Sequence, residues 1–156
     1  MTYDFPAAAY MQTGLDMRRP TLDEFGAAMI AGIESGELPK VDLPLEHFHP
    51  DGLYGRKIFM PAGTAVVSRV HARQHLTVAL TGKARVIDQD GSEVMIEAPM
   101  VWITEPGTQR ALHILEDSIW LTVHASDLTS VPDLEEALTC KTMAEYQTKY
   151  ITGGEK

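Results

Sequence analysis

Three polar side chains stand close together in an otherwise apolar stretch, "GTAVVSRVHARQHLTVALTG", which covers residues 63–82. They are Arg69, His71 and His75, and most of their neighbours are valine, alanine and leucine. Imidazole groups can bind a metal ion or act as a base, and guanidinium groups bind anions. Side chains two residues apart in a strand share a face, so Arg69 and His71 are predicted to point the same way. The stretch therefore predicts a metal site, an anion site, a catalytic base or the polar lining of a barrel.

The two glycines at the ends of this stretch give it a defined spacing. Five residues separate Gly63 from Arg69, one separates Arg69 from His71, three separate His71 from His75, and six separate His75 from Gly82. This spacing resembles the first motif of the cupin superfamily, whose three polar positions are His, His and Glu. Here Arg69 stands at the first His position and His75 at the Glu position.

A second segment extends the resemblance. In "EPGTQR", residues 105–110, Arg110 stands where the second cupin motif has a histidine. The resemblance covers residues 54–125 and implies a mainly β fold, a single cupin-type double-stranded β-helix, or jelly-roll barrel. It also implies that Arg69, His71, His75 and Arg110 meet inside that barrel.

The same combination of segments is similar to small cupin-like proteins encoded in bacteriophage genomes. That resemblance implies a non-catalytic binding or assembly protein, located in the host cytoplasm or the virion.

A metal site is one interpretation of the cluster. His71 and His75 keep two imidazoles, and His124 at the end of the last strand could supply a third if it faces inward. Two guanidiniums nearby would repel a divalent transition metal, which normally takes at least three protein ligands. We therefore expect no cofactor, and keep a transition metal at His71, His75 and His124 as the alternative.

An anion site is the second interpretation. Arg69 and Arg110 with the two histidines would suit a carboxylate, a phosphate or a nucleotide, and Trp102 could form an aromatic wall beside them. Packing in the core is the other role open to Trp102. Two guanidiniums buried without a counter-charge would be costly, and Glu105 is the acid nearest to them in sequence.

An enzyme is the third interpretation. His71 or His75 could act as the base of a metal-free epimerase or isomerase, or the histidines could serve a metal-dependent enzyme. No carboxylate falls at either motif's ligand positions to act as general acid. Three other candidates are assigned structural roles: "HFH" at 47–49 to a surface loop, His113 to the outside of the barrel, and Cys140 to helix packing.

The composition limits the partners. The 156 residues carry a formal net charge of −9 with a pI near 5.0, which argues against nucleic acid or an anionic membrane as a partner. A single cysteine excludes an intrachain disulfide and fits a reducing cytoplasm. No signal peptide and no run of about 20 apolar residues is present.

The periodicity predicts three parts: residues 1–53, 54–125 and 126–156. The first holds an arm over 1–20, a helix that begins at Thr21, and an extended connector over 37–53. Eight short strands follow, and one helix is expected over 132–150 with Ser130 as a cap. The arm has apolar residues but no period, so we expect it at the interface of a homo-oligomer or larger assembly.

Overall fold

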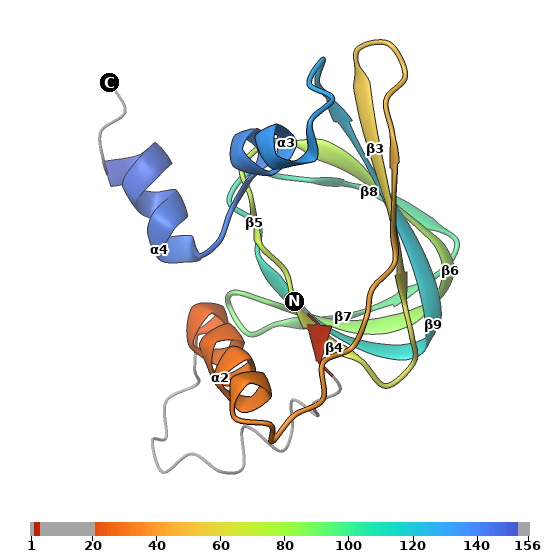
Figure 1. Ribbon diagram of the computed structural model, residues 1–156. Coiled ribbons are helices and arrows are strands. Elements are labelled where there is room, and N and C mark those ends of the chain that lie inside the picture. The colour runs from red at the N-terminus through yellow and green to blue at the C-terminus, as the bar shows by residue number, and fades with distance from the viewer. Residues whose placement is uncertain (1, 4–20, 153–156) are drawn as a thin grey trace.

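A computed structural model describes residues 2–3 and 21–152, and antiparallel strands curl around one interior (Figure 1). The helical segments lie together on one side of the strands. The strands are β1 (Thr2–Tyr3), β2 (Leu45–Phe48), β3 (Leu53–Met60), β4 (Ala65–Val67), β5 (Val70–His71), β6 (His75–Asp88), β7 (Glu93–Glu97), β8 (Met100–Thr104), β9 (Arg110–Ala125) and β10 (Thr139–Cys140). The helices are α2 (Leu22–Glu34), α3 (Val131–Leu138), α4 (Met143–Tyr146) and the π-helical turn η1 (Gln147–Thr152).

Two long strands, β6 and β9, organise the sheet. Strand β9 pairs with β3, β4 and β6, and β6 also pairs with β7 and β8. The sequence predicted a break in each long strand, at Gly82 and at residues 116–117, but both strands continue through these points. The register between them shifts three times between Ala79 and Ala84, so the turn-like residues form β-bulges that bend the strands.

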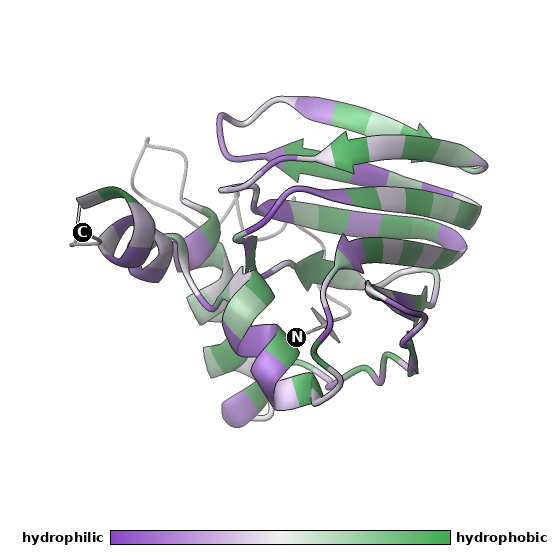
Figure 2. Ribbon diagram, turned by 90° about the horizontal axis from the view of Figure 1, so that it is seen from above, coloured by the Kyte–Doolittle hydropathy of each residue, from purple (hydrophilic) through white to green (hydrophobic). Residues whose placement is uncertain are grey.

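The strand register divides the side chains into an inner and an outer set. Along β3 the inward residues are Tyr54, Arg56, Ile58 and Met60, and those between them point outward. The alternation is visible as banding of hydropathy along the strands (Figure 2). The largest buried cluster lies inside the curl, formed by Met60, Val66, Ala79, Ala84, Val86, Ile96, Leu112 and Ile114.

Helix α2 begins as the sequence predicts. The Thr21 hydroxyl accepts a hydrogen bond from the Glu24 amide at 3.1 Å, and the Glu24 carboxylate accepts one from the Thr21 amide at 2.9 Å. Phe25 and Met29 on its inner stripe are buried against Ala65, Val67 and Ala111. This contact places the helix along β4 and beside the interior of the strands.

The single C-terminal helix predicted over 132–150 is wrong. Helix α3 begins after the predicted Ser130 cap and ends at Leu138, because Thr139 and Cys140 then pair with His71 and Val70 as a short β-ladder. The chain returns to helical structure only from Met143. Cys140 is therefore buried in a strand rather than in the predicted helix.

The connector and the N-terminal arm are the two remaining segments that the sequence predicted. The predicted connector over 37–53 contains β2, which pairs with β3 in register His47↔Arg56. The arm over 1–20 lies outside the described residues except for Thr2 and Tyr3, which pair with Val66 and Ala65. Among the helices of the described residues, none is long and apolar enough to cross a membrane.

Candidate functional site

A cavity of about 370 Å³ lies inside the strands and opens toward the helices. Its walls come from the inner sides of β3, β6, β8 and β9, and its rim from α2, α3 and residues 141–142. This volume is near the lower end of the range for small-molecule sites. The cavity therefore suits a ligand of a few to about a dozen non-hydrogen atoms better than a nucleotide.

The inner walls are graded from polar to apolar by the strand register. One inward row holds Thr104, His75, His124 and Tyr54, on β8, β6, β9 and β3. The next row along the same strands holds Trp102, Thr77, Thr122 and Arg56. The row after that is apolar, with Ala79, Trp120 and Ile58. A ligand in this space would meet imidazoles and a guanidinium at one end and an aromatic, aliphatic wall at the other.

Three histidines gather at the polar end of the cavity, as the metal interpretation requires: His75 and His124 in the first row, and His71 on β5 beside them. The ring centroids of His75 and His124 are 4.0 Å apart, and those of His71 and His75 are 4.7 Å apart. The His75 Nδ1 lies 3.0 Å from the carbonyl oxygen of Arg73. His71 and His124 line the cavity, whereas His75 lies behind them. The inward direction of His124, left open by the sequence, is therefore settled.

These imidazoles lie in a setting that favours their neutral form. Burial lowers the pKa of His71 to about 3, and neighbouring His75, His124, Arg56 and Arg110 act in the same direction. Burial, followed by the effects of His75 and Arg56, lowers the pKa of His124 to about 3 as well. The His71 Nδ1, the His75 Nε2 and both His124 nitrogens are buried without a hydrogen-bond partner among the described residues.

The cluster does not fit a metal ion in this arrangement. Unpartnered neutral imidazoles are the form that a metal takes, but the His75 and His124 rings stack at an interplanar angle of 24°. Ring lone pairs lie in the ring plane, so two stacked rings do not direct them at one point. Over residues 2–3 and 21–152, no three His, Cys, Asp or Glu side chains are placed to hold a metal. We therefore derive no chemistry through a metal.

Arg56 is the cavity residue that the sequence analysis missed. It points inward from β3, lines the cavity, and has no ion pair or side-chain hydrogen bond among the described residues. Burial lowers its pKa, but a guanidinium stays charged at neutral pH. The signal lay in "YGRKIFM", where Arg56 falls in strand phase with the large apolar residues Tyr54, Ile58 and Met60.

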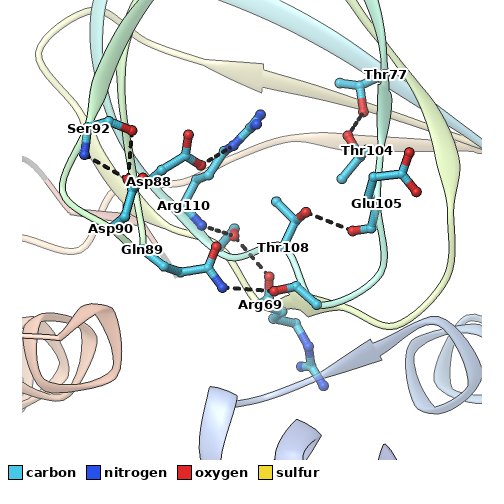
Figure 3. Close-up of polar contacts among 12 residues, drawn as sticks. Arg69, Thr77, Asp88, Gln89, Asp90, Ser92, Thr104, Glu105, Thr108 and Arg110 are labelled. Carbon is cyan, nitrogen blue, oxygen red and sulfur yellow. Dashed lines mark hydrogen bonds and ion pairs between the residues drawn. The ribbon is translucent and has the colours of Figure 1, made fainter.

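Arg69 takes a different direction from the one that strand parity predicts. Strand β4 ends at Val67 and β5 begins at Val70, so the alternation is interrupted between them. The Arg69 side chain points toward the C-terminal segment (Figure 3). Its Nε donates to the Thr139 hydroxyl at 2.9 Å. Arg69 still lines the rim of the cavity, and its charge lowers the pKa of Arg56.

Arg110 lines the cavity but has its own counter-charge. Its Nε donates to the Asp88 carboxylate at 2.8 Å, and the two residues are cross-strand partners of β9 and β6 (Figure 3). The counter-charge of Arg110 is therefore Asp88, an acid that the sequence analysis did not consider. Glu105, named as the acid nearest in sequence, is instead exposed and accepts a hydrogen bond from Gln74 at 3.0 Å.

The aromatic wall of the cavity includes both tryptophans. Trp102 lines the cavity, packs against the core and meets Trp120 edge to face, with ring centroids 5.3 Å apart. Within the part of the chain that the structure describes, the buried Trp102 Nε1 has no hydrogen-bond partner. Trp102 therefore takes both roles that the sequence allowed, packing and cavity lining.

The three histidines outside the cluster were predicted to lie in a surface loop or on the outside of the barrel. His47, expected in a surface loop, lies in β2, and its Nδ1 is 2.7 Å from the Tyr54 hydroxyl. His49 is exposed and stacks on Tyr54. His113 is in register with exposed Arg85, on the side of β9 away from the cavity, as expected.

The cavity carries net positive charge in an acidic protein. Four basic side chains line it, Arg56, Arg69, Arg110 and Lys141, against two carboxylates, Asp23 and Glu135. Asp23 is occupied by hydrogen bonds to backbone amides. Glu135 raises the pKa of Arg56 without reaching ion-pair distance.

Comparison with solved structures assigns the fold. Ectoine synthase from P. lautus is 13% identical, with a TM-score of 0.53 over 65% of this chain and 76% of its own. A Neisseria meningitidis protein is 13% identical over 70% of this chain and all of its own, with a TM-score of 0.48. A putative ethanolamine utilization protein from Salmonella typhimurium is 11% identical over 56% of this chain and 72% of its own, with a TM-score of 0.48.

The predicted fold class is confirmed: the strands form a jelly-roll barrel of the cupin type. Ectoine synthase is named as an enzyme, but at 13% identity the likeness shows the fold alone. No protein-family model and no curated protein matches the sequence. The likeness therefore extends to the fold, and the function must be argued from the cavity.

Proposed function

We propose that this protein binds a small organic anion inside its barrel, a carboxylate or phosphate ester with an apolar body. The observation that carries the proposal is Arg56, an inward guanidinium with no ion-pair partner among the described residues. A half-buried charge that is left unpaired costs free energy, which a bound anion would recover. Arg69 lies near enough to add a second positive charge at the same end.

The surroundings of Arg56 support an amphipathic ligand. Thr122 is its cross-strand partner, and Ile58 and Trp120 follow in the adjacent inward row. His71 and His124 are neutral and can donate hydrogen bonds to an anion without adding charge. A carboxylate at Arg56 would therefore leave its apolar body against the tryptophan wall.

The geometry of the cavity supports the enzyme and the assembly interpretations less well than it supports anion binding. The lowered pKa values of His71 and His75 keep the rings neutral but make them weak bases, which does not favour a base-catalysed reaction. The non-catalytic, phage-encoded assembly role rests on the sequence resemblance alone. Binding of an anion is the function that specific side chains support.

Thermal unfolding with a panel of anions tests the proposal. The panel contains inorganic phosphate, hexanoate, benzoate and phenylacetate, and calorimetry then gives the dissociation constant of any ligand found. At about 100 times its dissociation constant, a ligand should stabilise the fold by about 2.7 kcal/mol. The carboxylates with apolar bodies should bind more tightly than inorganic phosphate.

Arg56→Gln is the variant that locates the site, and Arg85→Gln is its matched control. Arg85 is an exposed arginine on β6 that faces away from the cavity. Arg56→Gln should weaken binding at least tenfold, about 1.4 kcal/mol, and leave the unliganded fold at least as stable as before, because the unpaired charge is removed. Binding that survives Arg56→Gln, or a panel without any stabilising anion, would contradict the proposal.

A further inference from the structure

The outer side of the barrel carries a continuous apolar surface across five strands. Register places Ile103, Leu76, Val123, Gly55 and Phe48 side by side on β8, β6, β9, β3 and β2. Ile103 is 59% exposed and Phe48 45% exposed. A Cβ built on Gly55 would lie 3.4 Å from the Phe48 Cβ and 3.8 Å from a Leu121 methyl, which confirms that these neighbours share one face.

The next row continues the same surface. Val101, Val78 and Leu121 are in register on β8, β6 and β9, followed by Lys57 on β3 and Glu46 on β2. Val101 is 60% exposed. Lys57 and Glu46 form an ion pair of 2.8 Å, so these two rows carry no net charge. We call the two rows together the outer apolar face.

We propose that the outer apolar face binds the same face of a second copy of this chain, forming a two-fold symmetric dimer. The exposed parts of its side chains amount to roughly 500 Å² of apolar surface, within the about 300–600 Å² of the largest apolar patch on a monomer, which often marks an interaction site. This is more than half of the about 800 Å² that each partner contributes to a standard interface. A two-fold contact requires a self-complementary patch, and these rows meet that requirement.

Charge also favours a second copy as the occupant. Each chain has a formal net charge of −9, so two copies repel each other over most of their surfaces. The outer apolar face carries only one ion pair, neutral in itself, so it can be buried without bringing like charges together. The face lies on the strands opposite the helices, so dimerisation leaves the cavity rim open (Figure 1).

The molar mass in solution tests this dimer. Light scattering of the full chain at about 50 µM should give twice the chain mass of 17.2 kDa. Ile103→Lys and Phe48→Gln, at opposite edges of the face, should each weaken the dimer at least tenfold. Met95→Lys is the control, because Met95 on β7 is 42% exposed but lies outside the face.

The variants are checked for folding by circular dichroism, and Phe48→Gln on the edge strand serves if Ile103→Lys does not fold. A monomeric wild-type chain at this concentration would overturn the proposal. So would folded Ile103→Lys and Phe48→Gln variants that remain dimeric, because the interface would then lie elsewhere. Anion binding to the monomeric variants should be unchanged, which separates this proposal from the proposed function.

Discussion

The Asp23 carboxylate accepts a hydrogen bond from the backbone amide of Met143 at 3.0 Å, across 120 residues of sequence. It also accepts from the Ala144 amide at 3.2 Å and from the Gln109 side chain at 3.1 Å. One side chain in the first turn of α2 therefore holds the start of α4 and the end of the loop before β9. Asp23, Gln109 and Thr142 all line the cavity rim, so these contacts fix the shape of its opening.

Asp23→Ala should release the C-terminal segment without unfolding the barrel. Hydrogen bonds to a charged group contribute about 1.5–3 kcal/mol, so the Met143 and Ala144 amides should exchange with deuterium at least tenfold faster. Mass-spectrometric hydrogen exchange of residues 141–152 measures this change. Asp51→Ala, at an exposed turn, is the control and should leave exchange in this segment unaltered. Unchanged exchange in Asp23→Ala would show that other contacts hold the segment.

Gly82 should be the glycine whose replacement damages the fold most. Its φ is +90°, and an added Cβ would collide with Ser118 and the Asp117 carbonyl at the bulge between β6 and β9. Gly82→Ala combines left-handed strain with a backbone collision and should cost about 3 kcal/mol or more.

Gly36 provides a matched control for this prediction. Its φ is +86°, but an added Cβ would meet nothing within 4 Å. Gly36→Ala should therefore cost only the backbone strain, about 1–2 kcal/mol. Urea unfolding of both variants measures the difference, and equal losses would show that the Ser118 contact relaxes at no cost.

The sequence predicts the barrel better than it predicts the direction of its polar side chains. Strand runs, glycine spacing and the Thr21 cap are local signals, and the structure contains each of them. The Arg69 side chain departs from the direction that strand parity predicts because the strand is interrupted beside it. No residue type in the sequence marks that interruption. Arg110 finds Asp88 only through the register of β6 and β9, a non-local contact.

The histidine cluster follows the same rule. His71 and His75 are marked by their spacing in one segment, whereas His124 joins them through pairing of β6 with β9, more than 40 residues later. Arg56 could have been found from strand phase alone, since it is in phase with the residues of β3 that face the interior. A basic residue in phase with the core-facing residues of a strand is therefore a candidate site residue even when it lies far from any motif in the sequence.

The fold should lose stability as the pH falls below about 6.5, and His124 should be one cause. Its pKa is about 3 in the folded protein, against an ordinary value near 6.5 in the unfolded chain. Between these pH values the unfolded chain binds a proton at this site that the folded protein does not. The free energy of unfolding therefore decreases as the pH is lowered. From pH 7 to pH 5 a single such imidazole lowers it by about 2 kcal/mol.

Urea unfolding of wild type and His124→Asn at pH 7, 6 and 5 isolates this contribution. The variant should show a smaller loss between pH 7 and pH 5, by about 2 kcal/mol, whatever its stability at pH 7. His113→Asn is the control, since it makes the same replacement at a histidine outside the cluster. An equal pH dependence in His124→Asn and wild type would mean that water or an anion reaches the ring and lets it accept a proton in the folded state.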